Sequence, residues 1–321
     1  NYSSKAVYMN FGRNSAIFED CLYVSGKHAE GSPIQAVYKY NTSSFVSGHT
    51  AVPHLSKWSG STQSLGGNDD FGSYIGSISA SSKGTIIGAP NYGASDWNGG
   101  YVNTGRVYYI ENYSNGTSGG LTPLNTSSMN LQHNEWAGDN VYTDENYVYA
   151  TFYGRSFSGR SAVAVWSWDN ISAAPTIIET ESGSGVDIGS LVSREALPSF
   201  IAPPTSGGAS TSRYVVVSTP TDSTYGSGAG AIYVFDANNL SAEFSQEGGP
   251  TKIMPLDSIS GGQFGTMAIH STSDKLFVAA ANDNSTSNQS PGLVYVYDVN
   301  DLSAQPTKLT AFDAAANDQF G

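Results

Sequence analysis

The dipeptide Phe-Gly recurs along this chain in one fixed context, at intervals of about 51 to 76 residues. The intact copies are Phe11-Gly12, Phe71-Gly72, Phe264-Gly265 and Phe320-Gly321. Two degenerate copies, Ala137-Gly138 and Ile188-Gly189, lie between the second and the third of these. Because self-similarity at such a period is typical of supersecondary units stacked side by side, the sequence predicts a repeat protein.

The same order of segments follows each copy of the dipeptide. A short apolar run comes first, at residues 21–24, 85–87, 147–149, 214–217 and 276–278. An alternating aromatic run comes next, at residues 36–40, 106–110, 164–168, 231–235 and 293–297. A weaker fourth segment has its best copies at residues 250–253 and 306–309. Short runs of β-branched and aromatic residues bounded by Gly and Asn indicate strands.

Four short antiparallel strands per unit, repeated five times, predict an all-β fold, a β-propeller with five complete blades. The repeat units are expected at residues 11–70, 71–136, 137–187, 188–263 and 264–319 of a single domain spanning 1–321. No window carries apolar residues at helical spacing, so almost no helix is expected. The alternative, a pair of β-sandwich sheets, does not account for the period.

Three motifs within these units resemble a known family. Phe-Gly opens the first strand of a unit, Gly88-Ala89-Pro90 closes an apolar run, and the last aromatic run reads Gly-Leu-Val-Tyr-Val-Tyr at 292–297. Together they resemble the FG-GAP repeat of integrin-α-like propellers, over residues 11–321. The segment 308–321 is similar to the junction between repeats in microbial secreted FG-GAP proteins. The resemblance implies a propeller that works in adhesion or assembly.

The motif residues have structural roles on physical grounds. Glycine after phenylalanine lets two backbones approach closely, and the aromatic ring fills the gap between blades. Proline ends the preceding strand because it cannot donate to the β-ladder. We therefore expect each Phe-Gly copy to be part of the scaffold.

The resemblance also implies calcium, which many members bind through alternating aspartates in the loop between the first two strands. The corresponding loops here, at residues 79–84, 142–146 and 270–274, lack that pattern. Calcium takes six to eight oxygen ligands, several of them charged. We therefore expect no metal and no other cofactor; residues 282–284 and 96–99 are weak alternatives, better interpreted as turns.

Composition and charge exclude several classes of partner. The formal net charge is −13, which disfavours nucleic acid and anionic membrane surfaces because both attract basic patches. No apolar stretch is long enough for a membrane span. Only 13% of the residues are charged, a pattern typical of loop-rich extracellular β-proteins. We expect an extracellular, secreted or cell-surface protein whose single cysteine, Cys21, is a buried thiol.

The chain carries nine glycosylation sequons, which support the extracellular prediction. They begin at Asn1, Asn41, Asn112, Asn115, Asn125, Asn170, Asn239, Asn284 and Asn288.

Known catalytic motifs are absent from the sequence, so an enzyme is the disfavoured interpretation. The five histidines are spread over three units without ligand spacing, at positions 28, 49, 54, 133 and 270. The preferred function is a structural or adhesive module that contacts other protein subunits. The alternative is a glycan-binding module in which Tyr92, Trp97 and Tyr101 of one loop stack on sugar rings.

The ends of the chain predict an incomplete set of blades. Residues 1–10 resemble the fourth strand of a neighbouring blade, and Phe320-Gly321 opens a further unit. One hypothesis is that additional sequence after Gly321 completes six or seven blades. The other is that a neighbouring subunit supplies the missing strands, which would build a head-to-tail homopolymer.

Overall fold

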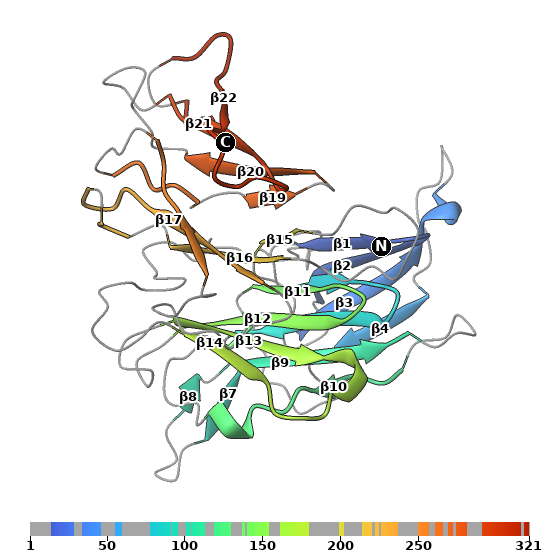
Figure 1. Ribbon diagram of the computed structural model, residues 1–321. Helices are drawn as coiled ribbons and strands as arrows, with labels where there is room; N and C mark the ends of the chain where they lie inside the picture. The colour runs from blue at the N-terminus through green and yellow to red at the C-terminus, as the bar shows by residue number, and fades with distance from the viewer. Residues whose placement is uncertain are drawn as a thin grey trace. The chain divides into compact units, whose positions relative to one another are not determined.

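In the residues that it describes, the computed structural model shows an all-β chain with five four-stranded antiparallel sheets and one short hairpin (Figure 1). It describes residues 14–28, 34–45, 55–59, 78–90, 92–95, 101–103, 105–112, 119–129, 137–138, 140–153, 161–179, 199–201, 214–219, 222–224, 226–236, 250–256, 261–265, 269–271, 274–280, 291–315 and 318–320. Helical structure in these ranges is limited to three single-turn 3-10 helices, Thr42–Ser44 (η2), Ser127–Met129 (η4) and Trp168–Asn170 (η5). The prediction of five four-stranded sheets with almost no helix is confirmed.

Each sheet draws its four strands from one continuous stretch of chain, and we call these sheets blades 1 to 5. Blade 1 contains β1 (Ser15–Phe18), β2 (Cys21–His28), β3 (Ile34–Asn41) and β4 (Ser56–Ser59). Blade 2 contains β5 (Ile78–Ala80), β6 (Gly84–Ala89), β9 (Arg106–Glu111) and β10 (Thr122–Pro123). Blade 3 contains β11 (Val141–Thr143), β12 (Tyr147–Tyr153), β13 (Ser161–Ser167) and β14 (Thr176–Glu179). Blade 4 contains β15 (Ser199–Ile201), β16 (Tyr214–Thr219), β17 (Ala231–Asp236) and β18 (Thr251–Ile253). Blade 5 contains β19 (Ile269–Ser271), β20 (Lys275–Ala280), β21 (Leu293–Asp298) and β22 (Thr307–Leu309).

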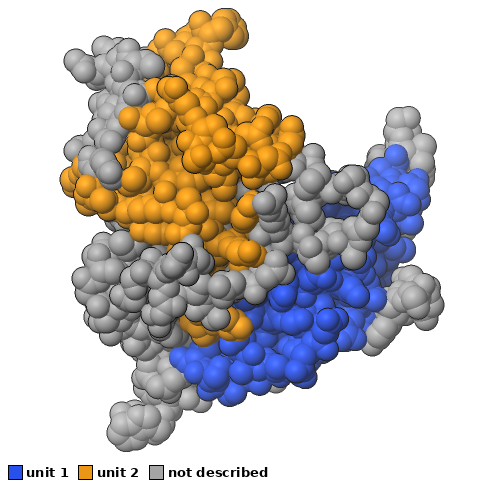
Figure 2. Space-filling model, in the orientation of Figure 1, with its two compact units in different colours: residues 1–156, 164–175 blue, residues 157–163, 176–321 orange. Residues whose placement is uncertain are grey.

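The chain forms two compact units, residues 1–156 with 164–175 and residues 157–163 with 176–321 (Figure 2). Blades 1 and 2 belong to the first unit, and blades 4 and 5 belong to the second. Within each unit the first strands of successive blades lie beside one another, β1 beside β5 and β15 beside β19. The single propeller domain expected for residues 1–321 stays a prediction.

Alternation of side chains along the strands gives each blade two apolar faces. In blade 4, Ile232 and Val234 of β17 lie on one face together with Ile253 of β18, and all three are buried. They pack in one cluster with Phe264 and the tyrosines of β21 in blade 5. We call the face that points to the next blade the trailing face and the opposite one the leading face. The core of each unit therefore lies between blades, where a trailing face meets a leading face.

The Phe-Gly dipeptide joins two blades through the backbone. Phe264 pairs in parallel with Gly230, which precedes β17 of the preceding blade, and its N–H donates to the Ala229 carbonyl at 2.9 Å. The Gly265 N–H then donates to the Ala279 carbonyl of its own blade at 2.8 Å. Phe264 and Gly265 therefore tie two sheets together, and we call this arrangement the Phe-Gly joint.

The same joint forms at other copies of the dipeptide. Ala137 pairs in parallel with Gly105, and Phe320 pairs in parallel with Gly292. The degenerate copy at Ala137 thus has the position that the sequence assigned to it. The copies at residues 11–12, 71–72 and 188–189 lie outside the described residues.

One detail of the predicted motif is wrong. The sequence suggested that Phe-Gly lies in the first strand of a unit, but Phe264 and Gly265 precede β19, which begins at Ile269. The physical reason is that Gly265 has a φ of +85°, which a β-strand does not accommodate. The expectation that β6 ends at the residue before Pro90 is confirmed.

Candidate functional site

The loop between the second and third strands differs in length and in residues between blade 2 and blade 4. In blades 2 and 4 these loops make the same pair of backbone hydrogen bonds. The N–H of Tyr92 donates to the Ala89 carbonyl at 2.9 Å, and the N–H of Asp222 donates to the Thr219 carbonyl at 3.0 Å. The carbonyl of Tyr92 or Asp222 then accepts from the glycine before the third strand, at 3.1 or 3.0 Å. Tyr92 and Asp222 therefore occupy equivalent positions with different chemistry.

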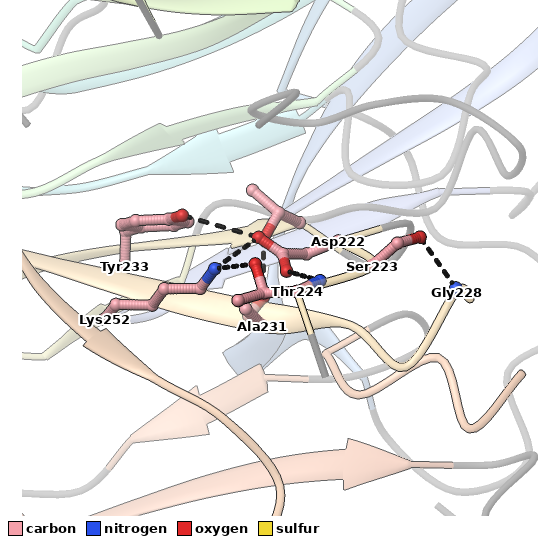
Figure 3. A network of polar contacts seen from close by, with 8 residues as sticks. Asp222, Ser223, Thr224, Gly228, Ala231, Tyr233 and Lys252 are labelled. Carbon is pink, nitrogen blue, oxygen red and sulfur yellow. Dashed lines mark hydrogen bonds and ion pairs between the residues drawn. The ribbon is translucent and has the colours of Figure 1, made fainter. Parts of the chain in front are cut away.

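In blade 4 this position carries a buried carboxylate with three kinds of donor (Figure 3). The side chain of Asp222 is only 2% exposed, and its Oδ2 lies 2.7 Å from the Nζ of Lys252 on β18. Its Oδ1 accepts from the backbone N–H of Thr224 at 2.9 Å. The hydroxyl of Tyr233, on β17, donates to Oδ2 at 3.4 Å.

Lys252, which pairs with Asp222, also contacts Thr224 and Tyr233. Lys252 Nζ donates to Thr224 Oγ1 at 2.6 Å and lies 5.5 Å from the centre of the Tyr233 ring. The N–H of Gly228 donates to Ser223 Oγ at 3.0 Å, which closes the same loop. We call the group of Asp222, Thr224, Tyr233 and Lys252 the blade 4 network. It links the loop to β17 and β18.

Burial and charge act in opposite directions on the carboxylate. Burial alone would raise the pKa of Asp222, but the hydrogen bonds from Lys252 and Thr224 outweigh it and lower the pKa. Burial, followed by the negative charge of Asp222, raises the pKa of Tyr233. The carboxylate is thus ionised and the phenol neutral at neutral pH, so the network is suited to hold the loop rather than to transfer protons.

In blade 2 the loop forms a β-hairpin of its own, β7 (Gly93–Ser95) and β8 (Tyr101–Asn103). Tyr92 lies at the base of this hairpin, and Tyr101 pairs with Ser95 near the tip. The Arg106 guanidinium carbon lies 4.1 Å from the centre of the half-buried Tyr92 ring. This cation–π contact covers ring surface that a sugar would use.

The three residues of the predicted glycan site are therefore placed only in part. The structure puts Tyr92 and Tyr101 at opposite ends of the hairpin, while Trp97 lies outside the described residues. The glycan site stays a prediction.

The loop at 142–146 corresponds to the calcium loop of the FG-GAP family, but the sequence predicts that it binds no calcium. A local turn holds this loop. Oδ1 of Asp144 accepts from the N–H groups of Asn146 and Tyr147, at 2.7 and 2.8 Å. Glu145 accepts hydrogen bonds from Ser82 of the corresponding loop in blade 2. Within the described ranges, no three His, Cys, Asp or Glu side chains gather as metal ligands would. The alternatives at 96–99 and 282–284 lie outside those ranges.

Removing calcium is expected to leave the stability unchanged. The loop at 142–146 is closed by backbone hydrogen bonds to Asp144, and no set of metal-ligand carboxylates gathers in the described ranges. EDTA should therefore shift the melting temperature by less than about 2 °C. Differential scanning fluorimetry with EDTA and with added calcium measures this. A fall of several degrees that calcium reverses would show that a site exists elsewhere in the chain.

Four of the nine sequon asparagines lie in the described part of the chain. Oδ1 of Asn41 accepts from the Ser43 N–H and hydroxyl, at 2.9 and 2.6 Å, and Asn170 is exposed. The Nδ2 of Asn112 donates to the Ser81 carbonyl at 3.1 Å, and the Nδ2 of Asn125 donates to the Ser172 carbonyl at 3.2 Å. A glycan on Asn112 or Asn125 would break these bonds, so the geometry favours Asn41 and Asn170. Asn1, Asn115, Asn239, Asn284 and Asn288 lie outside the described residues.

Sequence reasoning missed the blade 4 network. A signal was present, because a lysine lies opposite a tyrosine in three blades: Lys57 with Tyr38, Lys252 with Tyr233, and Lys308 with Tyr295. The lysine nitrogen lies between 5.5 and 5.8 Å from the ring centre in each pair. What the pattern does not show is that Asp222 folds back onto one of these lysines.

Comparison with solved structures decides the architecture. The chain is similar to the structure titled "The beta-propeller domain of the Trilobed protease from Pyrococcus furiosus reveals an open velcro topology". The TM-score is 0.50 at 9% sequence identity, with 95% of this chain and 72% of that chain covered. The fold is a β-propeller.

The other comparisons add no family. No family model matches the sequence, and no curated protein matches it. The propeller likeness at this identity concerns the fold alone. None of the helices in the described ranges is long and apolar enough to cross a membrane.

Proposed function

We propose that the chain is a non-catalytic, extracellular structural or adhesive propeller module of the FG-GAP type, which holds protein–protein contacts in a cell-surface or fibrous assembly. The observation that carries the proposal is a set of large apolar side chains exposed on and beside the described strands. Phe312, just after β22, is fully exposed, and Leu309 on β22 is 42% exposed. Exposed apolar side chains that cluster on a protein mark interaction surfaces.

Charge and composition support the same proposal. A net charge of −13 suits a soluble surface module and opposes nucleic acid as a partner. Among the described sequons, Asn41 and Asn170 are those that the geometry favours for glycosylation, and they support export. The charged groups of the blade 4 network bind one another, which fits a scaffold better than a catalytic centre.

The experiment compares capture of proteins with capture of sugars. Immobilised protein is expected to retain defined proteins from the extracellular material of the cells that make it, and the variant Phe312→Ser is expected to retain about tenfold less. A glycan array should give no saturable signal. Binding on the array that free sugar competes away would overturn the proposal in favour of the glycan-binding alternative at Tyr92, Trp97 and Tyr101.

A further inference from the structure

The turn after β22 holds a phenylalanine in solvent. The N–H of Ala314 donates to the Ala311 carbonyl at 3.3 Å, which places Phe312 and Asp313 in the middle of a four-residue turn. Phe312 is fully exposed. The backbone therefore sets the position of this ring, and its apolar surface contributes nothing to the core.

Blade 4 carries an apolar side chain at the same position. The pairing of the third strand with the fourth has one register in blades 4 and 5, in which Lys252 is equivalent to Lys308. Leu256 and Phe312 each lie four residues after that lysine. Leu256 is 46% exposed. Because blades 4 and 5 share one apolar cluster within one compact unit, both positions belong to the same unit.

The fold does not require an apolar residue at this position. In blade 2, Pro123 takes the place of Lys252 in the strand pairing, and the fourth residue after it is the exposed Ser127. A large apolar side chain left in water gains nothing from folding. The recurrence of such a side chain in two neighbouring blades, at Leu256 and Phe312, indicates a role in binding.

Acidic side chains border both apolar positions. Asp313 follows Phe312 and is exposed, and Asp257 follows Leu256 in the sequence. Asp318 is also exposed, and its Oδ2 accepts a backbone N–H of the same loop at 2.6 Å. An aromatic ring beside a carboxylate matches an arginine, because a guanidinium group stacks on rings and binds carboxylates through two parallel hydrogen bonds.

We propose that Phe312 and Leu256 bind an arginine-bearing, apolar segment of a partner protein. The inference rests on the proposed function and names the chemistry of its partner. A guanidinium group of the segment stacks on Phe312 and pairs with Asp313, as Arg106 stacks on Tyr92 at 4.1 Å within this chain. Apolar side chains of the segment cover Leu256. The net charge of −13 attracts such a segment, and salt screens the attraction.

Fluorescence anisotropy with a defined probe tests this chemistry. The probe is a labelled peptide of alternating arginine and leucine, and its counterpart has glutamate in place of arginine. Wild type is expected to bind the arginine peptide at least about tenfold more tightly than Phe312→Ser or Asp313→Asn does. The affinity should fall as NaCl rises from about 50 to about 500 mM, and the glutamate peptide should not bind. Equal affinities of wild type and Phe312→Ser overturn the proposal.

Matched variants separate this site from a general attraction to an acidic protein. Phe45→Ser and Asp169→Asn change an exposed phenylalanine of blade 1 and an exposed aspartate of blade 3, and both should bind the peptide as wild type does. A loss in these controls as large as that in Phe312→Ser overturns the proposal. Phe312→Ser should also keep the wild-type melting temperature. A fall of several degrees overturns the proposal, because it would show that the ring is covered within the chain.

Two further results would identify a different occupant or a different role. Co-sedimentation with neutral phosphatidylcholine vesicles that Phe312→Ser abolishes overturns the proposal in favour of a lipid surface. Retention of extracellular proteins by wild type without binding of the arginine peptide overturns the inference, while the proposed function stands. Binding of the peptide with no extracellular protein retained contradicts the proposed function and supports the arginine site.

Discussion

Replacing Gly230 with alanine is expected to lower the free energy of unfolding by about 3 kcal/mol. A Cβ at this position would lie 2.5 Å from both the N and the O of Phe264, which are backbone atoms of the next blade. Gly230 also has a φ of +86°, which costs an alanine about 1 kcal/mol by itself. The remainder comes from forcing the Phe-Gly joint apart.

Two other glycines separate these contributions. Gly261 has a φ of +81° with no atom within 4 Å of the added Cβ, so Gly261→Ala should cost only the conformational part, about 1 kcal/mol. Gly120 has neither constraint in the structure, and Gly120→Ala should be nearly neutral. Denaturant unfolding of the three variants measures the series. Equal losses for Gly230→Ala and Gly261→Ala would show that the joint does not hold the blades together.

Replacing Lys252 with methionine is expected to cost about 3 kcal/mol, because it leaves the buried Asp222 carboxylate without its counter-charge. Asp222→Asn removes the charge but keeps an acceptor for the Thr224 N–H, and should cost about 2 kcal/mol. The double variant should be less destabilised than the sum of the two, by about 2 kcal/mol. Additivity within about 0.5 kcal/mol would contradict the coupling.

The pH dependence follows from the lowered pKa of Asp222. The stability that the pair contributes is fully present above the unfolded-state pKa of about 3.9 and is lost as the pH falls through the folded-state value. The difference in free energy of unfolding between wild type and Asp222→Asn should therefore shrink in strongly acidic buffer.

Lys308→Met is the control for Lys252→Met. Because Lys308 is exposed at the equivalent position of blade 5, Lys308→Met should cost less than about 1 kcal/mol.

The repeat was readable from sequence because scaffold positions recur. Alternation in β21 and the Phe-Gly dipeptide repeat in several units, so one copy supports another, and even Ala137 could be assigned. The position of Phe-Gly outside the first strand was not readable, since it depends on the φ of Gly265. The hairpin β7–β8 was missed because Gly93 and Ala94 have low β-propensity.

The blade 4 network could not be predicted from the sequence, because its residues are far apart along the chain. Asp222 and Lys252 are separated by 30 positions, and only the pairing of β17 with β18 brings the lysine beside the loop. Nothing about an aspartate in a Ser- and Gly-rich loop indicates that it folds inward. Tyr92 shows the opposite case. The sequence suggested that its ring stacks on a sugar, but the ring lies half-buried against Arg106.

Because of the Phe-Gly joint, the boundaries of a folded blade do not coincide with the boundaries of a sequence repeat. The hydrogen bond that finishes the edge of blade 4 at Ala229 is donated by Phe264, which belongs to the following unit. During synthesis a blade is therefore completed only when the first residues of its successor have left the ribosome. A gene duplication that copied units from one Phe-Gly to the next would preserve every such bond, because each new copy arrives with the residues that complete its predecessor.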